Sequence, residues 1–353
     1  MVWRRTCARP VDGDAAEQMQ AHRLVTCDSW RWRRNERRKD GVGSVRASVR
    51  TVSVDKTLQA IDEALRKDDE RTAVELATSM AEEGKLRGFG KSQLVPKRSY
   101  SLAELKLNKI DTTKFLAPVD TIVENVTKNL LVASVAAIAA SAYFFHLEAR
   151  QVLGVGMGYF FFKSVDQVAN AGGVEALLID TAVRVVEPKF ARRVAEHEAG
   201  HFLIAYLVGI LPKTYTLSSL DVFRKFKVLN VQAGTLFCDE AFQKEVASGK
   251  LSSASLDRYC CVALAGVSTE YIRYGHAEGG TNDVQQLDAT LRALRFSQKK
   301  ADDQVRWSVL NTVELLRRHE RVHASLVDAM LAGESVGSCI QVIEDALEGV
   351  AFI

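Results

Sequence analysis

The chain has little that would mark it as a disulfide-stabilised or nucleic-acid-binding protein. Its six cysteines, at positions 7, 27, 238, 260, 261 and 339, include no CxxC pair and no regular spacing, which argues against a disulfide framework or a zinc ribbon. We interpret them as free thiols, and the adjacent Cys260 and Cys261 as small apolar residues on a buried helix. The formal net charge of +3 over 353 residues is close to balance, so the composition does not favour nucleic acid as the main partner.

The first 50 residues contain no apolar run of the signal-peptide type, so we do not expect secretion. They are rich in arginine, carry three of the four tryptophans and include WRWRRNERRK at positions 30–39. The segment VGSVRASVR at 42–50 is typical of the cleavage context of plastid presequences, and we predict that 1–50 form a transit peptide for a chloroplast membrane, thylakoid or envelope. Six acidic residues in the same region are unusual for such a peptide. A disordered N-terminus and a nuclear-localisation or RNA-binding patch are the alternatives.

Two amphipathic helices are predicted before a linker at 87–100. Over 55–86, apolar residues recur at three- and four-residue spacing among charged ones, which is the pattern of helices with one buried face. We interpret 51–127 as a helical arm, either a hairpin or a partner-binding segment. Glycine and proline interrupt the pattern in the linker, and Ser101 with Glu104 gives the capping-box pattern that starts the next helix.

The linker contains Gly90-Lys91-Ser92, which resembles the end of a phosphate-binding P-loop but lacks the rest of the motif. A P-loop needs a glycine five positions before its second glycine, and that position is Lys85. The segment also follows a charged helix, whereas a P-loop emerges from a buried strand. We therefore expect that this chain binds no ATP.

A membrane anchor or hairpin is predicted at 128–163. Nineteen residues, Asn129 to Leu147, contain no Asp, Glu, Lys or Arg. As a helix they would be roughly 28 Å long, at the short end of what crosses a bilayer. The high alanine content leaves a buried core helix as the alternative. The following segment QVLGVGMGYFFFK, 151–163, is too short to span, but its spaced glycines and aromatic run suit close helix packing or an interfacial anchor.

The segment VAEHEAGHFLIAYLVG, from Val194 to Gly209, holds the strongest chemical signal in the sequence. His197 and His201 are four residues apart on a predicted helix, so both imidazoles project from one face and can bind a single Zn²⁺. Glu198 can hydrogen-bond a water on that metal and take its proton as general base. The neighbouring residues are apolar, and two histidines on a buried helix face need a partner, for which a metal is suited.

A catalytic zinc site needs a third protein ligand and an open fourth position. Three acidic residues downstream are candidates: Glu270 on a predicted helix, Glu278, and Asp283 at the start of the next helix. The residues alone do not rank them. The chain beyond Pro188 is otherwise predicted to be mostly helical, with one short extended stretch, KTYTLSS to VLNVQAGTLF, between the first two helices. We place the start of this domain near residue 185.

Three segments of the chain resemble the peptidase domain of the FtsH family of membrane-bound zinc proteases: FARRVAEHEAGHFLIAYLVGILP, ALAGVSTEYIRYG and GGTNDVQQLDATLRA. That family has HEAGH, a G-x-x-AEE-x-x-FG helix and a G-A-x-ND-x-x-x-AT segment, and the similarity extends over roughly 185–345. The resemblance implies that His197 and His201 are zinc ligands and Glu198 the base. It also implies that Asp283, at the aspartate of the ND pair, is the third ligand.

The resemblance is incomplete in two places. Glu270 falls on the first glutamate of the AEE segment, but Tyr271 replaces the second, which bears on the support of the site. FtsH proteins also carry a large ATPase module before the peptidase, and no such module is found in this sequence, which most resembles the small motorless FtsH-like proteins of plant plastids.

The fold expected from these observations is mainly α. A helical FtsH-type peptidase domain with one short β element, 185–345, would follow the arm and the membrane segment. The expected function is zinc-dependent endopeptidase activity on unfolded or membrane-proximal proteins in plastids, with complete FtsH subunits or further copies of the chain as assembly partners and no nucleic acid. The alternatives are a non-proteolytic scaffold or chaperone-like partner of complete FtsH subunits, and a structural membrane protein with an accidental motif.

Overall fold

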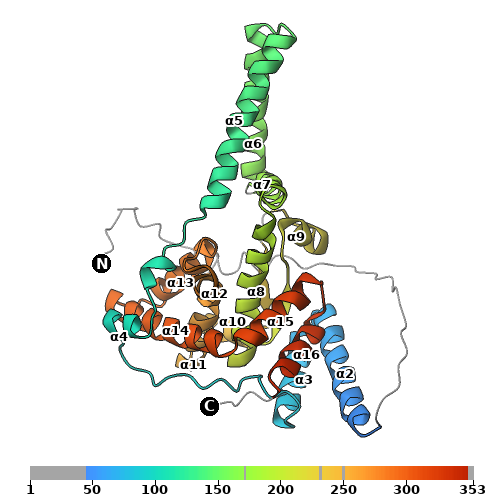
Figure 1. Cartoon of the computed structure of the whole chain (residues 1–353), viewed down its shortest axis with the longest axis vertical. Helices are drawn as coiled ribbons and strands as arrows, with labels where there is room; N and C mark the ends of the chain where they lie inside the picture. Colours follow the sequence, from blue (N-terminus) through green and yellow to red (C-terminus); the bar gives the residue numbers. More distant parts are fainter. Residues whose placement is uncertain (1–44, 171, 230–232, 249–250, 349–353) are drawn as a thin grey trace. The chain divides into compact units, whose positions relative to one another are not determined.

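The computed structural model describes residues 45–170, 172–229, 233–248 and 251–348, and these are mainly helical with one two-stranded sheet (Figure 1). The mainly α fold with a short β element is therefore confirmed. The predictions made for 1–44 lie outside the described residues. Residues 45–50, which we assigned to the transit peptide, form the first turns of helix α2.

The longest connection between the elements is the linker from α3 to α4. In order they are α2 (Val45–Arg66), α3 (Glu70–Glu82), α4 (Leu102–Leu107), the 3₁₀ turn η1 (Thr112–Lys114), α5 (Thr121–Phe144), α6 (Ala149–Asn170), α7 (Gly173–Val186), α8 (Pro188–Val208), β1 (Pro212–Tyr215), α9 (Ser219–Phe226), β2 (Thr235–Phe237), α10 (Glu240–Ala247), α11 (Ser253–Ala263), α12 (Ala265–Tyr274), α13 (Thr281–Ala293), α14 (Gln298–Arg318), α15 (Glu320–Leu331) and α16 (Val336–Ala346).

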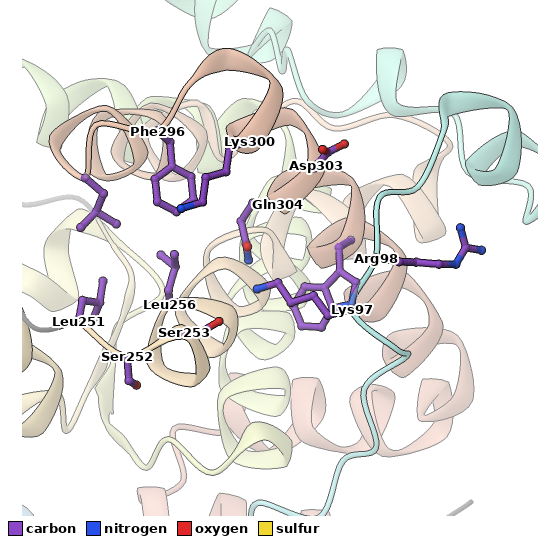
Figure 2. A pocket seen from close by; sticks show the side chains of 12 residues that line it. Lys97, Arg98, Leu251, Ser252, Ser253, Leu256, Phe296, Lys300, Asp303 and Gln304 are labelled. Carbon is purple, nitrogen blue, oxygen red and sulfur yellow. The ribbon is translucent and has the colours of Figure 1, made fainter.

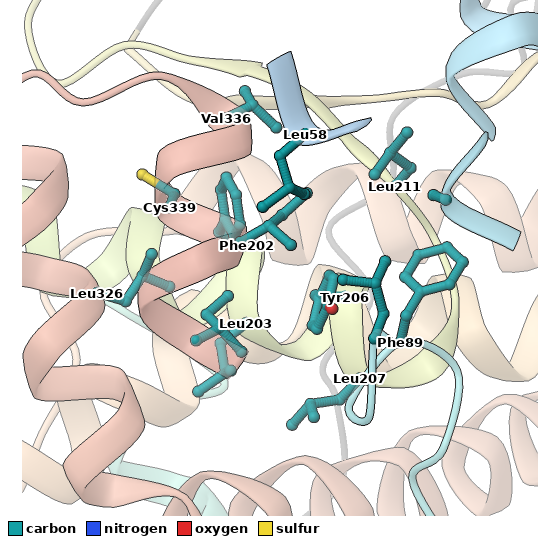
Figure 3. Packing of buried hydrophobic residues seen from close by; sticks show 14 of the residues in the cluster. Leu58, Phe89, Phe202, Leu203, Tyr206, Leu207, Leu211, Leu326, Val336 and Cys339 are labelled. Carbon is teal, nitrogen blue, oxygen red and sulfur yellow. The ribbon is translucent and has the colours of Figure 1, made fainter. Parts of the chain in front are cut away.

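The helix α8 carries the HEAGH segment and is the central element of the core. Pro188 occupies its first turn, where the missing N–H costs nothing, and Gly209 ends it in the left-handed conformation. Every residue from Ala195 to Val208 is buried, because α12, α15, α11, α14 and α7 all pack against this helix. Large apolar side chains on its second half, including Phe202 and Tyr206, interlock with residues of neighbouring elements (Figure 3).

The predicted helical arm is observed as α2 and α3, which pack against each other. Leu58 and Ile61 of α2 and Ala77 of α3 are buried in the same cluster as Phe202 of α8. The arm and the region after 185 therefore share a hydrophobic core. The predicted capping box is also present, because Ser101 and Glu104 exchange side-chain to backbone hydrogen bonds at the start of α4.

The Gly-Lys-Ser segment of the linker has a structural role. The backbone N–H groups of Gly90 and Ser92 donate to the carbonyls of Tyr206 and Leu207 in the last turn of α8. A Cβ added to Gly209 would approach the Cα of Gly90 to 3.1 Å, so glycine permits the close contact. This is the backbone geometry of a helix cap.

The extended stretch predicted after α8 contains the two strands, but it also contains a helix that the sequence analysis missed. β1 and β2 pair antiparallel, with Thr214 opposite Leu236. Between them lies α9, whose eight residues are capped by the Ser218 side chain and cover little more than two turns. An amphipathic pattern of that length is too short to be distinguished from a loop.

Helices α5 and α6 form a hairpin whose side chains are almost entirely exposed. Val126 is the buried residue of α5 and Asp166 that of α6. A core helix was the alternative for 129–147, and this exposure does not fit it. Within the described part of the chain, α5 alone is long and apolar enough to cross a membrane.

Asp166 joins the hairpin to the rest of the fold. Its carboxylate accepts hydrogen bonds from the backbone N–H groups of Val174 and Glu175 and so caps the first turn of α7. Helix α7 contacts α5, α6 and α8, and a single residue, Glu187, separates it from α8. The hairpin is therefore connected through α7 to the helix that carries HEAGH.

Candidate metal centre

Helix α8 and the first turn of α13 bring three potential ligand atoms together. His197 Nε2 lies 3.2 Å from His201 Nε2, and Asp283 Oδ2 lies 3.1 Å and 3.3 Å from these two nitrogens. A tetrahedral centre with metal–ligand distances of about 2.0–2.1 Å has ligand atoms about 3.3 Å apart. The spacing therefore fits a single metal ion, and this His/His/Asp group could hold one.

The protonation of the two imidazoles is set by their outer partners. His201 Nδ1 lies 2.8 Å from the carbonyl oxygen of Val262, which can only accept, so this nitrogen carries the proton. His197 Nδ1 donates in the same way to Glu270 Oε1 at 2.8 Å. In its neutral form, each ring has its lone pair on Nε2, directed at the same point as the Asp283 oxygen. Three converging lone pairs suit a cation between them, either a metal ion or a proton.

Glycines make room for the His197 ring. A Cβ on Gly266 of α12 would come within 2.1 Å of His197 Nε2, and one on Gly280 within 2.9 Å of Cε1. Gly280 also has a φ of +81°, which disfavours any side chain there. On the next turn of α8, a Cβ on Gly200 would meet Thr269 Oγ1 at 2.2 Å. The site is thus built by close approach of α12 and the 279–280 loop to α8.

Glu270 is a buried positioning group behind His197 and contacts no other ligand. Its Oε2 atom forms an ion pair with Arg193 at 2.7 Å and accepts from the backbone N–H of Glu278 at 3.0 Å. Burial raises the pKa of Glu270, but His197 and Arg193 outweigh it and hold the pKa at about 2. Glu270 therefore stays ionised and keeps the His197 proton on Nδ1.

The pKa values of Asp283 and His197 are shifted in opposite directions. Burial raises the pKa of Asp283, but the adjacent His201 and His197 outweigh it, and the net pKa lies well below its usual range. Burial lowers the pKa of His197, but Asp283 and Glu270 outweigh it, and the net pKa lies well above the usual value. The carboxylates thus attract positive charge to this point, and a bound metal would replace the protons there.

Glu198 lies next to the ligands but makes a different contact. It is buried, at 6% exposure, and its Oε2 atom accepts a hydrogen bond from Thr235 Oγ1 at 2.9 Å. Thr235 is the first residue of β2, so the two-stranded sheet positions the carboxylate beside the metal centre. The Thr235 hydroxyl thus orients one oxygen of the Glu198 carboxylate.

The third-ligand candidates occupy three different positions. Asp283 is with the histidines, and Glu270 stands behind His197. Glu278 pairs with Arg193 at 2.7 Å and accepts from the Thr121 hydroxyl at the start of α5 at 3.0 Å. It therefore connects the base of the hairpin to the loop that precedes Asp283.

The tyrosine at the second position of the family's AEE segment is tied to another part of the chain. The Tyr271 hydroxyl accepts from the backbone N–H of Asp111 at 3.0 Å and donates to the carbonyl of Lys109 at 3.2 Å. Its ring also stacks on Phe115, with centroids 4.7 Å apart. Tyr271 thus anchors the segment after α4 against α12.

Sequence reasoning missed Arg193, Thr235, Gly266 and Gly280. Arg193 pairs with Glu270 and Glu278, which lie on other elements, so no spacing along α8 indicates these contacts. Gly280 lies in the glycine pair that begins GGTNDVQQLDATLRA, where paired glycines indicate a tight turn. Nothing in the sequence indicates Thr235, because β2 reaches Glu198 through the fold alone.

A separate cavity of about 390 Å³ lies among the end of the linker, the start of α11 and the start of α14 (Figure 2). Lys97, one of its basic residues, pairs with Asp257 and lies 5.0 Å from the Trp307 ring. Lys300 covers Phe296 at 3.9 Å. None of the residues that line it is a predicted site residue, and we assign it no chemistry.

The two adjacent cysteines behave as expected for apolar core residues. Cys260 and Cys261 are buried in α11, and burial raises the pKa of Cys261 to about 12. Both are held as thiols and are not suited to act as metal ligands or nucleophiles.

Comparison with known proteins returned no relative: no family model, no curated protein and no solved structure matches this chain.

Proposed function

We propose that the chain is a zinc-dependent endopeptidase of FtsH type. The observation that carries the proposal is the convergence of His197 Nε2, His201 Nε2 and Asp283 Oδ2 on one point beside the buried carboxylate of Glu198. Two imidazoles four residues apart and one carboxylate from another helix are the ligand set of catalytic zinc sites, which keep a fourth position open.

Zinc suits this donor set better than the other common cations. Calcium and magnesium prefer six or more oxygen ligands or several waters, whereas here two of three ligand atoms are nitrogens at tetrahedral spacing. The hydrogen bonds from both Nδ1 atoms to Glu270 and Val262 are the outer contacts that orient metal-binding imidazoles. When bound, zinc would polarise a carbonyl oxygen and lower the pKa of a water molecule toward 7.

Glu198, Thr235 and the pair of Glu270 with Arg193 would then each have a role in peptide hydrolysis. Glu198 accepts the proton of the attacking water and returns it to the leaving amine, as a general base and then a general acid. The Thr235 hydroxyl holds one carboxylate oxygen of Glu198, which fixes the direction of the other. Glu270 and Arg193 keep His197 in the tautomer that presents Nε2 to the metal.

The proposal of FtsH type rests on the resemblance of the sequence over 185–345. The resemblance assigns Asp283 as third ligand, and the observed distances support that assignment over Glu270 and Glu278. Tyr271 stands where the family has the second glutamate of AEE. The carboxylate that contacts His197 is that of Glu270, so this replacement does not remove it.

We propose that the α5–α6 hairpin anchors this peptidase in a plastid membrane. The support is the length of α5, the exposure of its apolar side chains and the aromatic run of α6, in which Phe160 and Phe161 are 74% and 70% exposed. Thr121 at the base of the hairpin bonds to Glu278 near the metal centre. Substrates are proposed to be unfolded or membrane-proximal segments, with complete FtsH subunits or further copies of this chain as assembly partners.

The full chain, purified in detergent and loaded with zinc, should cut an unfolded protein such as casein without ATP. Removal of the metal with a chelator should abolish cleavage, and zinc should restore it. If zinc-loaded protein cuts no unfolded substrate, alone or with complete FtsH subunits, the peptidase proposal is wrong, and a scaffold role in such an assembly becomes the better interpretation.

A further inference from the structure

Helix α9 has an exposed apolar and basic surface that the metal centre does not use. Val222 faces the core and is buried, whereas Leu220 and Phe223 are each 37% exposed. The residues after them, Arg224 and Lys227, are also exposed. A short helix with apolar and basic residues together on its outer surface is typical of helices that lie in the headgroup region of a membrane.

The position of α9 is fixed by α7. The backbone N–H of Ser219 donates to Asp180 Oδ2 at 2.9 Å, which adds a second acceptor at the start of α9. Arg184 of α7 donates to the carbonyl of Leu217 just before the helix and pairs with Asp180 at 3.1 Å. The two helices are therefore held together by buried or half-buried polar contacts.

Helix α7 in turn forms the base of the hairpin. It contacts both α5 and α6 as well as α9, and Figure 1 shows α9 beside α7 where the hairpin meets the rest of the fold. Three apolar residues of α7, Leu178, Val185 and Val186, are 61%, 77% and 68% exposed. If the hairpin is in lipid, α7 and α9 lie where the hydrocarbon gives way to headgroups.

The charge of α9 suits one kind of membrane surface. The stretch 219–227 contains one acid, Asp221, and three basic residues, Arg224, Lys225 and Lys227, which gives a net charge of +2 (3 − 1). Lys225 is engaged with the carbonyl of Tyr215. Among the described residues, Arg224 and Lys227 form no ion pair, so both cations can meet anionic headgroups.

We infer that α9 is an interfacial helix that docks the metal-binding domain on a bilayer containing anionic lipid. Leu220 and Phe223 enter the boundary between headgroups and acyl chains, while Arg224 and Lys227 contact the lipid phosphates or carboxylates. The inference rests on the proposed membrane anchoring by α5 and α6, and it adds a second contact that the hairpin does not provide.

Docking of α9 would fix how far the metal centre stands from the membrane. Pro188 begins α8 directly after α7, and Glu198 lies ten residues further along. At 1.5 Å per residue, this is about 15 Å of helix. A substrate anchored in the same bilayer would therefore need about five extended residues beyond the membrane surface before one of its peptide bonds reached Glu198.

The test uses the full chain in vesicles, with an environment-sensitive fluorescent amino acid placed singly at position 223, 161 or 331. Phe161 reports on the hairpin, and Leu331 is an exposed apolar residue of α15, 43% exposed, that serves as the aqueous control. Quenching by nitroxide-labelled lipids is measured in phosphatidylcholine vesicles with and without phosphatidylglycerol. We expect the probe at 223 to be quenched several-fold more than that at 331, only when phosphatidylglycerol is present.

Two changes should remove this quenching at 223 but not at 161: high salt, and the double substitution R224E/K227E. If position 223 is no more quenched than 331 in anionic vesicles while 161 is quenched, the interfacial helix is wrong and the anchor stands. If 223 is shielded from water without lipid quenching, α9 binds protein instead of lipid. If 161 itself is not quenched, the anchor is wrong and the interfacial helix fails with it. None of these outcomes depends on peptidase activity.

Discussion

Gly266 lies so close to the ring of His197 that a methyl group on its Cα would come within 2.1 Å of Nε2. The position of that imidazole is therefore determined by the absence of a side chain on α12, the helix with the most extensive packing against α8.

Gly266→Ala should displace His197 and weaken zinc binding without unfolding the chain. Because the orientation of a metal-binding imidazole is worth about 10- to 100-fold in affinity, we expect a loss of at least that size. Zinc affinity measured by competition with a chelator, together with the thermal unfolding midpoint of the metal-free protein, checks this. Gly154→Ala in α6 is the matched control, since its Cβ meets nothing within 4 Å. If Gly266→Ala binds zinc as tightly as the unaltered chain, the position of the His197 ring does not depend on the missing side chain at 266.

Glu270→Gln should reduce zinc affinity by about 10- to 100-fold, because the carboxylate that holds the Nδ1 proton of His197 is lost. Glu278→Gln is the matched control, since it removes the other carboxylate from Arg193 but does not touch the imidazole. Asp283→Ala should abolish tight binding. A fully retained affinity in Asp283→Ala, with loss in Glu270→Ala, would mean that the third ligand is misassigned.

Thr235→Val should keep bound zinc and lower kcat, because Glu198 loses the hydroxyl that orients its Oε2 atom. One hydrogen bond to a charged group contributes about 1.5–3 kcal/mol, so a decrease of about 10- to 100-fold in kcat is expected. Thr235→Ser restores the hydroxyl and should restore the rate. Equal rates for the valine and serine variants would argue that Thr235 only supports the strand.

The intact protein should remain with membranes through an alkaline carbonate wash, because α5 exposes apolar side chains over a length sufficient to span. Removal of 121–170 should release the protein, with folding of the remainder checked by its zinc content. If the wash extracts the intact protein completely, the hairpin does not anchor it in the bilayer, and another protein must cover the exposed apolar side chains.

Much of the site could be predicted from local sequence because local geometry dictates it. The four-residue spacing of His197 and His201 puts their side chains on one face of any helix, and the position of Asp283 at the start of a helix follows from the preceding glycine turn. The choice of Asp283 over Glu270 needed the family resemblance. Both acids are within reach of His197, and only the three-dimensional arrangement separates a ligand from a positioning group.

The rest depends on contacts between distant segments, which no periodicity encodes. Thr235 reaches Glu198 because β2 pairs with β1, and Gly266 meets His197 because α12 crosses α8 closely. Helix α9 was missed because two turns give too few residues to establish a period. The exposure of α5 could likewise be read only from the packing, since an alanine-rich helix is compatible with a core or a bilayer.

The most direct test of the central claim is the rate of casein cleavage by Glu198→Gln in zinc-loaded, ATP-free protein. The substitution removes the base but leaves both imidazoles and Asp283, so zinc content and the unfolding midpoint should equal those of the unaltered chain. The cleavage rate should fall by about 10²- to 10⁴-fold, the usual contribution of a positioned general base. Glu320→Gln, an exposed carboxylate on α15, should cleave at the original rate. Cleavage that Glu198→Gln leaves unchanged would contradict the assignment and trace the activity to a contaminating protease.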